Sequence, residues 1–205
     1  MPLTDKDQML VFYKERLVFL SMPKTGTTAF QSALSPHADI VIKDPPQLKH
    51  APVYRYNRFF QPMFEKACKV EMETLAVMRE PISWLGSWYR YRQRPFMKGK
   101  PNSTAGLSFD QFIEAYMNDQ KPGFANVGVQ SRFLEPKPGG TPIDHLFRYE
   151  EQPSLVAFLK VRLGLTFRLE RKNVSPPMDL QLSSGVETAF RKKFAPEFAL
   201  YNSIS

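Results

Sequence analysis

Residues 16–34 read RLVFLSMPKTGTTAFQSAL, which places a short apolar strand directly before P-K-T-G-T-T and a helical pattern directly after it. A strand that turns tightly into a helix presents backbone N–H groups at the positive end of the helix dipole, where an anion binds with little side-chain help. Lys24 adds a full positive charge, and Thr25, Thr27 and Thr28 add hydroxyl donors. The stretch therefore predicts a phosphate-binding loop.

The order of residues in this loop restricts the class of ligand that it could bind. A loop that binds ATP or GTP reads G-x-x-x-x-G-K-[ST], with the lysine after the glycines. Here Lys24 precedes the single glycine, Gly26, and the loop is shorter. We expect an anionic, phosphate-like ligand that is not an ordinary magnesium–nucleoside triphosphate.

Strand-like and helical patterns alternate along the chain. Short apolar runs predict strands at residues 17–21, 40–42, 75–78 and 143–149. Helical periodicity predicts helices at residues 27–34, 51–68, 81–92, 109–118, 154–163 and 184–194, with a short one near 196–202. This alternation predicts an α/β fold with a mostly parallel sheet covered by helices on both faces. The 205 residues suit one domain, residues 1–205.

The amino-acid composition restricts the class of protein and the cellular compartment that we expect. Hydrophobic residues make up 42% of the chain, which is ordinary for a globular protein, and no apolar run approaches the ~20 residues that span a bilayer. The first residues lack the apolar core of a secretory signal. Cys68 is the single cysteine, so a disulfide framework or a cysteine-based metal cluster is excluded. We expect a cytoplasmic protein with no membrane span.

The net charge of +8 favours polyanionic partners. Basic and aromatic residues alternate at 53–69 and again at 88–92. Two amphipathic helices with aromatic side chains in the core explain this better than a nucleic-acid surface, because no arginine-rich arm, RNA-binding aromatic strand or zinc-finger spacing accompanies them. We expect no specific nucleic-acid partner.

A second group of residues follows a later strand. The run at 74–78 reads as a buried strand that delivers Arg79 to the carboxyl edge of the sheet, where ligands bind in open α/β folds. Pro81 then begins a helix that carries Ser87. An arginine at the strand end and a serine two turns along the helix can converge on one phosphate. Alternatively, Arg79 pairs with Glu80, and Ser87 is a small residue where helix and sheet meet.

Together, P-K-T-G-T-T and R-E-P-x-x-x-x-x-S-W-Y resemble the two nucleotide-binding motifs of sulfotransferases that use 3′-phosphoadenosine 5′-phosphosulfate (PAPS). The resemblance is closest to the carbohydrate-type branch and its bacterial relatives, and it implies their fold, which is like that of P-loop NTPases. It assigns the 3′-phosphate to Arg79 and Ser87. It also implies that the 5′-phosphosulfate is held by the first loop, which consists of Lys24, Thr25, Gly26, Thr27 and Thr28.

One segment departs from the cytosolic branch of this family. Its C-terminal R-K-G-x-x-G-x-W-K is absent, and R-K-N-V-S at residues 171–175 occupies a similar place. This segment is a candidate to close over the nucleotide.

Sulfuryl transfer is an in-line displacement in which negative charge builds on the oxygen that bridges to the departing phosphate. By analogy with phosphoryl transfer, the protein mainly positions the reactants and neutralises this charge. We assign that role to Lys24, and the alternative is a surface lysine in a turn. The chemistry requires no metal, and the sequence offers no clear acidic site for one.

The acceptor hydroxyl must lose a proton to a base. Among the three histidines, His50 lies between the second predicted strand and the basic–aromatic helix, where carbohydrate sulfotransferases often place a catalytic His or Glu. We take His50 as the candidate base, and the alternative is a histidine that caps or packs locally at the helix start. Asp44 and Glu80 are reserve candidates.

The expected acceptor is a hydroxyl, or less favourably an amine, on a carbohydrate, lipid or small molecule. Two other functions stay open. A kinase or NTPase on the same scaffold is disfavoured by the missing G-K-[ST] order. A non-catalytic polyanion-binding module would bind nucleic acid or sulfated glycan with steep salt dependence. The sequence leaves the oligomeric state open.

Overall fold

The computed structural model describes residues 8–170 and 180–204. These residues form two compact units. Unit 1 contains residues 8–79, 130–170 and Ile204, and unit 2 contains residues 80–129 and 180–203. The chain thus leaves unit 1 directly after Arg79 and returns to it at Gln130. The single domain expected from chain length stays a prediction.

Unit 1 holds the sheet and the helices around it. Its strands are β1 (Met9–Phe12), β2 (Leu17–Phe19), β3 (Ile40–Ile42), β4 (Glu73–Met78) and β5 (His145–Arg148). Its helices are α1 (Thr27–Leu34), α2 (Pro46–Lys49), α3 (Val53–Arg55), α6 (Gln130–Leu134) and α7 (Gln152–Leu163), with 3-10 turns at Ser35–His37 and Tyr149–Glu151. After α3 the helix continues in π-helical turns, Tyr56–Phe60 and Met63–Ala67.

The sheet has the strand order β3-β1-β2-β4-β5. β2 pairs parallel with β4, and β4 pairs parallel with β5, whereas β1 pairs antiparallel with both β2 and β3. The predicted α/β class is confirmed, but the prediction of a mostly parallel sheet is wrong, because the sheet is mixed. The difference comes from β1, which was not predicted. β1 turns back into β2 through residues 13–16, where Arg16 adopts a left-handed backbone with φ 52°.

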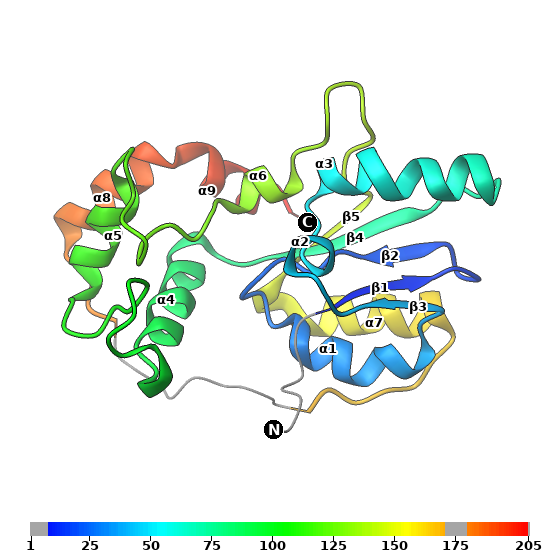
Figure 1. Ribbon diagram of the computed structural model, residues 1–205, viewed down its shortest axis with the longest axis horizontal. Helices are drawn as coiled ribbons and strands as arrows, with labels where there is room; N and C mark the ends of the chain where they lie inside the picture. The colour runs from blue at the N-terminus through cyan, green and yellow to red at the C-terminus, as the bar shows by residue number, and fades with distance from the viewer. Residues whose placement is uncertain (1–7, 171–179, 205) are drawn as a thin grey trace. The chain divides into compact units, whose positions relative to one another are not determined.

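Helices flank the sheet, with α1 and α7 on one face and the helix that starts at α3 on the other (Figure 1). Phe30 of α1 and Leu159 of α7 share a buried cluster with Phe19 of β2 and Val77 of β4. β2 is fully buried. Burial of these apolar side chains, at about 25 cal/mol per Å², holds strands and helices together and fixes the direction of β2 and β4.

Unit 2 is built from helices around an aromatic core. Its helices are α4 (Pro81–Arg92), α5 (Phe109–Met117), α8 (Ser184–Lys193) and α9 (Ala195–Asn202), with a 3-10 turn at Pro95–Met97. Trp84, Tyr89, Phe112 and Phe190 lie in one buried cluster. Of the aromatic residues in the stretch at 88–92, which were predicted to face the core, Tyr89 lies in this cluster and Trp88 packs against it.

Most predicted helices are confirmed with small shifts of their ends. The predicted helices at 27–34 and 81–92 have the observed bounds. The helix predicted at 51–68 begins at Val53 and is mostly π-helical. The short helices α2 and α6 were not predicted. None of the helices in residues 8–170 and 180–204 combines the length and apolarity needed to cross a bilayer.

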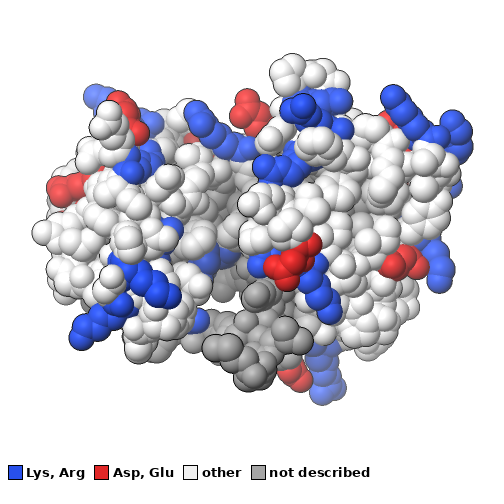
Figure 2. Space-filling view, viewed as in Figure 1, with Lys and Arg blue, Asp and Glu red and all other residues white. Residues whose placement is uncertain are grey.

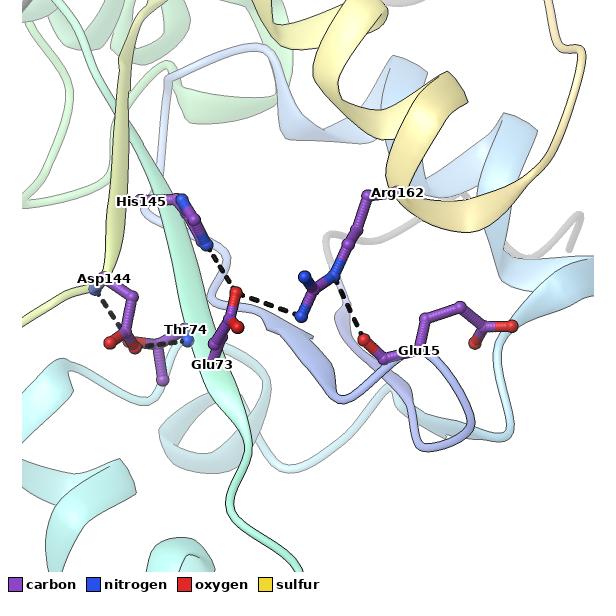
Figure 3. Close-up of polar contacts among 6 residues, drawn as sticks. All are labelled: Glu15, Glu73, Thr74, Asp144, His145 and Arg162. Carbon is purple, nitrogen blue, oxygen red and sulfur yellow. Dashed lines mark hydrogen bonds and ion pairs between the residues drawn. The ribbon is translucent and has the colours of Figure 1, made fainter.

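A polar network joins the amino ends of β4 and β5 (Figure 3). Arg79 follows the other end of β4. Oε2 of Glu73 lies 2.7 Å from Nε2 of His145 and 3.0 Å from Nη2 of Arg162. The Arg162 Nε–H donates to the Glu15 carbonyl at 3.1 Å. Beside this group, Asp144 accepts from the N–H and the hydroxyl of Thr74. His145 is thus engaged away from the predicted site.

This network predicts how stability depends on pH. The hydrogen bond from His145 lowers the pKa of Glu73 below its ordinary value; partial burial opposes this, and Arg162 adds to it. A carboxylate whose pKa is lowered by folding stabilises the fold when the pH is above 4.5, the pKa of the unfolded chain. This stabilisation is lost as the pH falls through the lowered pKa of the folded state. Because Glu73 is 43% exposed, solvent screens these contacts.

We expect Glu73→Gln to lower the free energy of unfolding at pH 7 by at most about 1 kcal/mol. Urea denaturation between pH 7 and pH 3 measures the difference from the natural chain, which should shrink toward acid pH. Glu71→Gln at a neighbouring exposed position is the control and should show no such trend. A difference that stays constant over the whole range would contradict the assignment.

Candidate functional site

The loop between β2 and α1 has two left-handed residues within three positions. Lys24 has φ 68°, and Gly26, which precedes the first turn of α1, has φ 72°. The left-handed conformation costs a residue with a Cβ atom roughly 1–2 kcal/mol, so the backbone at Lys24 is strained. Such strain is typical of ligand-binding loops.

Hydrogen bonds within the loop explain how this shape is kept. The Thr25 hydroxyl donates to the Met22 carbonyl at 2.9 Å, and Thr25 is 1% exposed. The Thr25 hydroxyl therefore closes the loop, and the assignment of Thr25 to the ligand stays a prediction. Thr27 and Thr28 occupy the first turn of α1, where helix geometry gives the amide groups no acceptor within the helix. These amides and the dipole of α1 favour an anion at this point.

Arg79 lies beside this loop because β2 and β4 run parallel. Its Nη1 donates to the Lys24 carbonyl at 3.4 Å, a long and therefore weak hydrogen bond. Its guanidinium carbon lies 4.2 Å from the centre of the Tyr149 ring, within the range of a cation–π contact. The structure thus brings Arg79 to the P-K-T-G-T-T loop, as the sequence predicted from the two strand ends.

Tyr149 also contacts the loop itself. A Cβ atom at Gly26 would lie 2.6 Å from Cε2 of Tyr149, closer than side-chain carbons approach one another. Glycine is therefore required at position 26 for two reasons: the backbone has a positive φ, and the Tyr149 ring leaves no room for a Cβ atom. Sequence reasoning did not single out Tyr149. The signal was present, since the strand predicted at 143–149 ends at the same edge of the sheet as Arg79.

Gln130 fixes the main chain of Arg79. Its Oε1 accepts from the Arg79 N–H at 3.0 Å, and its Nε2 donates to the Arg79 carbonyl at 2.8 Å. Gln130 is 1% exposed, so both hydrogen bonds form away from water. Gln130 was also missed, because it lies on a five-residue helix with no local motif.

His50 is tied to the start of the loop. Its Nδ1 lies 2.8 Å from the carbonyl oxygen of Ser21, three residues before Lys24. Because a carbonyl only accepts, Nδ1 donates in this contact, so a neutral form of the ring would carry its lone pair on Nε2. Ser21 is itself fixed: its hydroxyl donates to the Gln8 carbonyl, and Gln31 of α1 donates to that hydroxyl. This tautomer is the one a base that acts through Nε2 requires.

The other predicted residues have separate surroundings. Ser87 lies on α4 in unit 2 and is 9% exposed, so its pairing with Arg79 on one phosphate stays a prediction. The carboxylate of Glu80 accepts from the Ser83 N–H at 2.7 Å and caps α4, which accounts for it without a role as base. Asp44 is exposed. Residues 171–175, the candidate nucleotide cover, lie outside the described residues.

Taken together, unit 1 places the P-K-T-G-T-T loop, the Arg79 guanidinium and the His50 imidazole on neighbouring segments. In the described ranges 8–170 and 180–204, no three or more His, Cys, Asp or Glu side chains are grouped in a way that could hold a metal ion. Comparisons with protein-family models, with curated proteins and with solved structures each gave no match. Helix-start amides and a guanidinium are groups that bind anions in general, and an imidazole is a group that can accept a proton.

The hydrogen bonds of Gln130 predict a stability effect. Gln130→Ala removes two buried hydrogen bonds of about 1 kcal/mol each, so we expect the free energy of unfolding to fall by about 2 kcal/mol. Urea denaturation measures it. Arg132→Ala, at an exposed position of the same helix, is the matched control and should change it by less than about 0.5 kcal/mol. Equal effects of the two substitutions would show that the Gln130 side chain does not hold Arg79.

Proposed function

We propose that the chain is a sulfotransferase that moves a sulfuryl group from PAPS to a hydroxyl acceptor by in-line displacement. One observation carries this proposal: Arg79 lies at the P-K-T-G-T-T loop, with its Nη1 3.4 Å from the Lys24 carbonyl. Two sites for negative charge at one edge of the sheet suit a nucleotide that carries phosphate groups at two positions.

In this proposal the loop holds the 5′-phosphosulfate. The first amides of α1 contact its oxygens, and Lys24 neutralises the charge that builds on the oxygen between sulfur and phosphorus. Arg79 holds the 3′-phosphate, and the sequence-based assignment of Ser87 to the same phosphate stays a prediction. A guanidinium with two parallel N–H groups matches a phosphate better than an ammonium does.

His50 completes the reaction as the base. The acceptor oxygen forms a bond to sulfur, the bond from sulfur to the bridging oxygen breaks, and adenosine 3′,5′-bisphosphate leaves with that bond's electron pair. The hydroxyl proton passes to Nε2 of His50, while Nδ1–H keeps its hydrogen bond to the Ser21 carbonyl. We propose a carbohydrate, lipid or small molecule as acceptor.

On the face drawn in Figure 2, basic side chains stand among neutral and acidic ones. A protein that follows a nucleic-acid backbone needs a continuous basic stripe or groove. The net charge of +8 is instead compatible with a small, highly charged ligand.

Ligand-induced stabilisation tests the nucleotide. Without magnesium, adenosine 3′,5′-bisphosphate at 100 times its Kd should stabilise the protein by about 2.7 kcal/mol. For a chain of this size that corresponds to a rise in melting temperature of roughly 5–10 °C. ATP, with and without magnesium, is the comparison and should shift it less. An equal or larger shift with magnesium–ATP would overturn the proposal.

Kinetics of three variants separate chemistry from binding. We expect Lys24→Ala to lower kcat about 10²–10³-fold, because charge in the transition state is no longer neutralised. His50→Gln should lower kcat by about 10²–10⁴-fold. Both should bind adenosine 3′,5′-bisphosphate nearly as the natural chain does. Arg79→Ala should weaken that binding about tenfold to hundredfold.

The assay is PAPS-dependent sulfation of a panel of hydroxylated glycans, lipids and phenols, followed by mass spectrometry. Lys43→Ala, at an exposed position away from the loop in sequence, is the control for loss of a positive charge. Full turnover by Lys24→Ala would remove the central role given to that residue.

A further inference from the structure

Tyr149 lies where the two proposed anion sites meet. It directly follows β5, and β5 pairs in parallel with β4 so that Arg148 lies opposite Met78. The next residues along the two strands, Tyr149 and Arg79, are therefore neighbours at the carboxyl edge. Tyr149 opens a 3-10 turn, which ends the strand at this position.

The Tyr149 ring contacts both sites at once. Its Cε2 edge packs on Gly26 in the loop proposed for the 5′-phosphosulfate. The Arg79 guanidinium, proposed for the 3′-phosphate, lies over the ring at 4.2 Å. The same guanidinium donates to the Lys24 carbonyl, so loop, ring and arginine form a closed set of contacts.

The contact with the ring is compatible with phosphate binding. A cation–π contact comes from the attraction of the positive charge to the ring, whereas a phosphate is bound by guanidinium N–H groups. A flexible arginine loses rotamer freedom when it binds an anion, and an arginine held by a ring has lost part of it already. The ring therefore improves Arg79 as a phosphate ligand by holding its plane in one orientation relative to the loop.

We propose that Tyr149 is a positioning residue that orients Arg79 against the phosphate-binding loop and thereby sets the preference for a nucleotide with a second phosphate at the 3′ position. This inference rests on the proposed function. It assigns Tyr149 no contact with the reacting atoms, since it acts through Arg79.

The test compares two ligands that differ only in the 3′-phosphate. Calorimetry measures the Kd of adenosine 5′-phosphate and of adenosine 3′,5′-bisphosphate, and their ratio is the gain from the 3′-phosphate. Tyr149→Leu keeps an apolar side chain but removes the aromatic face, so the gain should fall about fivefold while the Kd of adenosine 5′-phosphate stays unchanged. Tyr149→Phe keeps the face and should retain the gain.

Phe147→Leu is the matched control, because Phe147 lies on the same strand and packs against Phe158 instead of Arg79. It should lower the melting temperature without changing the gain. If Tyr149→Leu weakens both ligands equally, or Tyr149→Phe also loses the gain, Tyr149 is a packing residue and the inference is overturned. If the natural chain itself shows no gain from the 3′-phosphate, the proposed function fails, and the inference on Tyr149 fails with it. A failure of the inference alone leaves the gain of the natural chain intact.

Discussion

The parallel pairing of β2 with β4 is the constraint on which the site depends. It places Val18 opposite Thr74 and Phe19 opposite Leu75, so both strands end at one edge of the sheet. The P-K-T-G-T-T loop follows one strand and Arg79 follows the other. Both strands are buried, so their direction cannot change without exposing the core that they share with α1 and α7.

The amino ends and the carboxyl ends of the parallel strands differ in their physical chemistry. At the amino ends, Glu73, His145 and Arg162 satisfy one another and join β4, β5 and α7. At the carboxyl ends, Arg79 lies beside the P-K-T-G-T-T loop, and the backbone at Lys24 is held in a strained left-handed conformation. This contrast is what makes the carboxyl edge the functional one in our account.

Local signals in the sequence predicted much of this arrangement. The helices at 27–34 and 81–92 were predictable because a glycine-containing loop and Pro81 mark their starts. β1 was not, because the turn at residues 13–16 holds no Gly, Asn or Pro to indicate a hairpin. The loop and Arg79 were predictable from strand ends. Gln130 acts through contacts with Arg79 that are distant in sequence and leaves no local pattern, whereas Tyr149 could have been placed from the end of the strand predicted at 143–149.

The central claim is that one doubly phosphorylated nucleotide occupies both the loop and Arg79. An NMR titration of the ¹⁵N-labelled protein with adenosine 3′,5′-bisphosphate, without magnesium, tests it most directly. The account predicts that the backbone N–H signals of Gly26, Thr27 and Thr28 and the side-chain Nε–H signal of Arg79 shift together and saturate with a single Kd. Shifts confined to other basic residues, or saturation of the loop without Arg79, would contradict it.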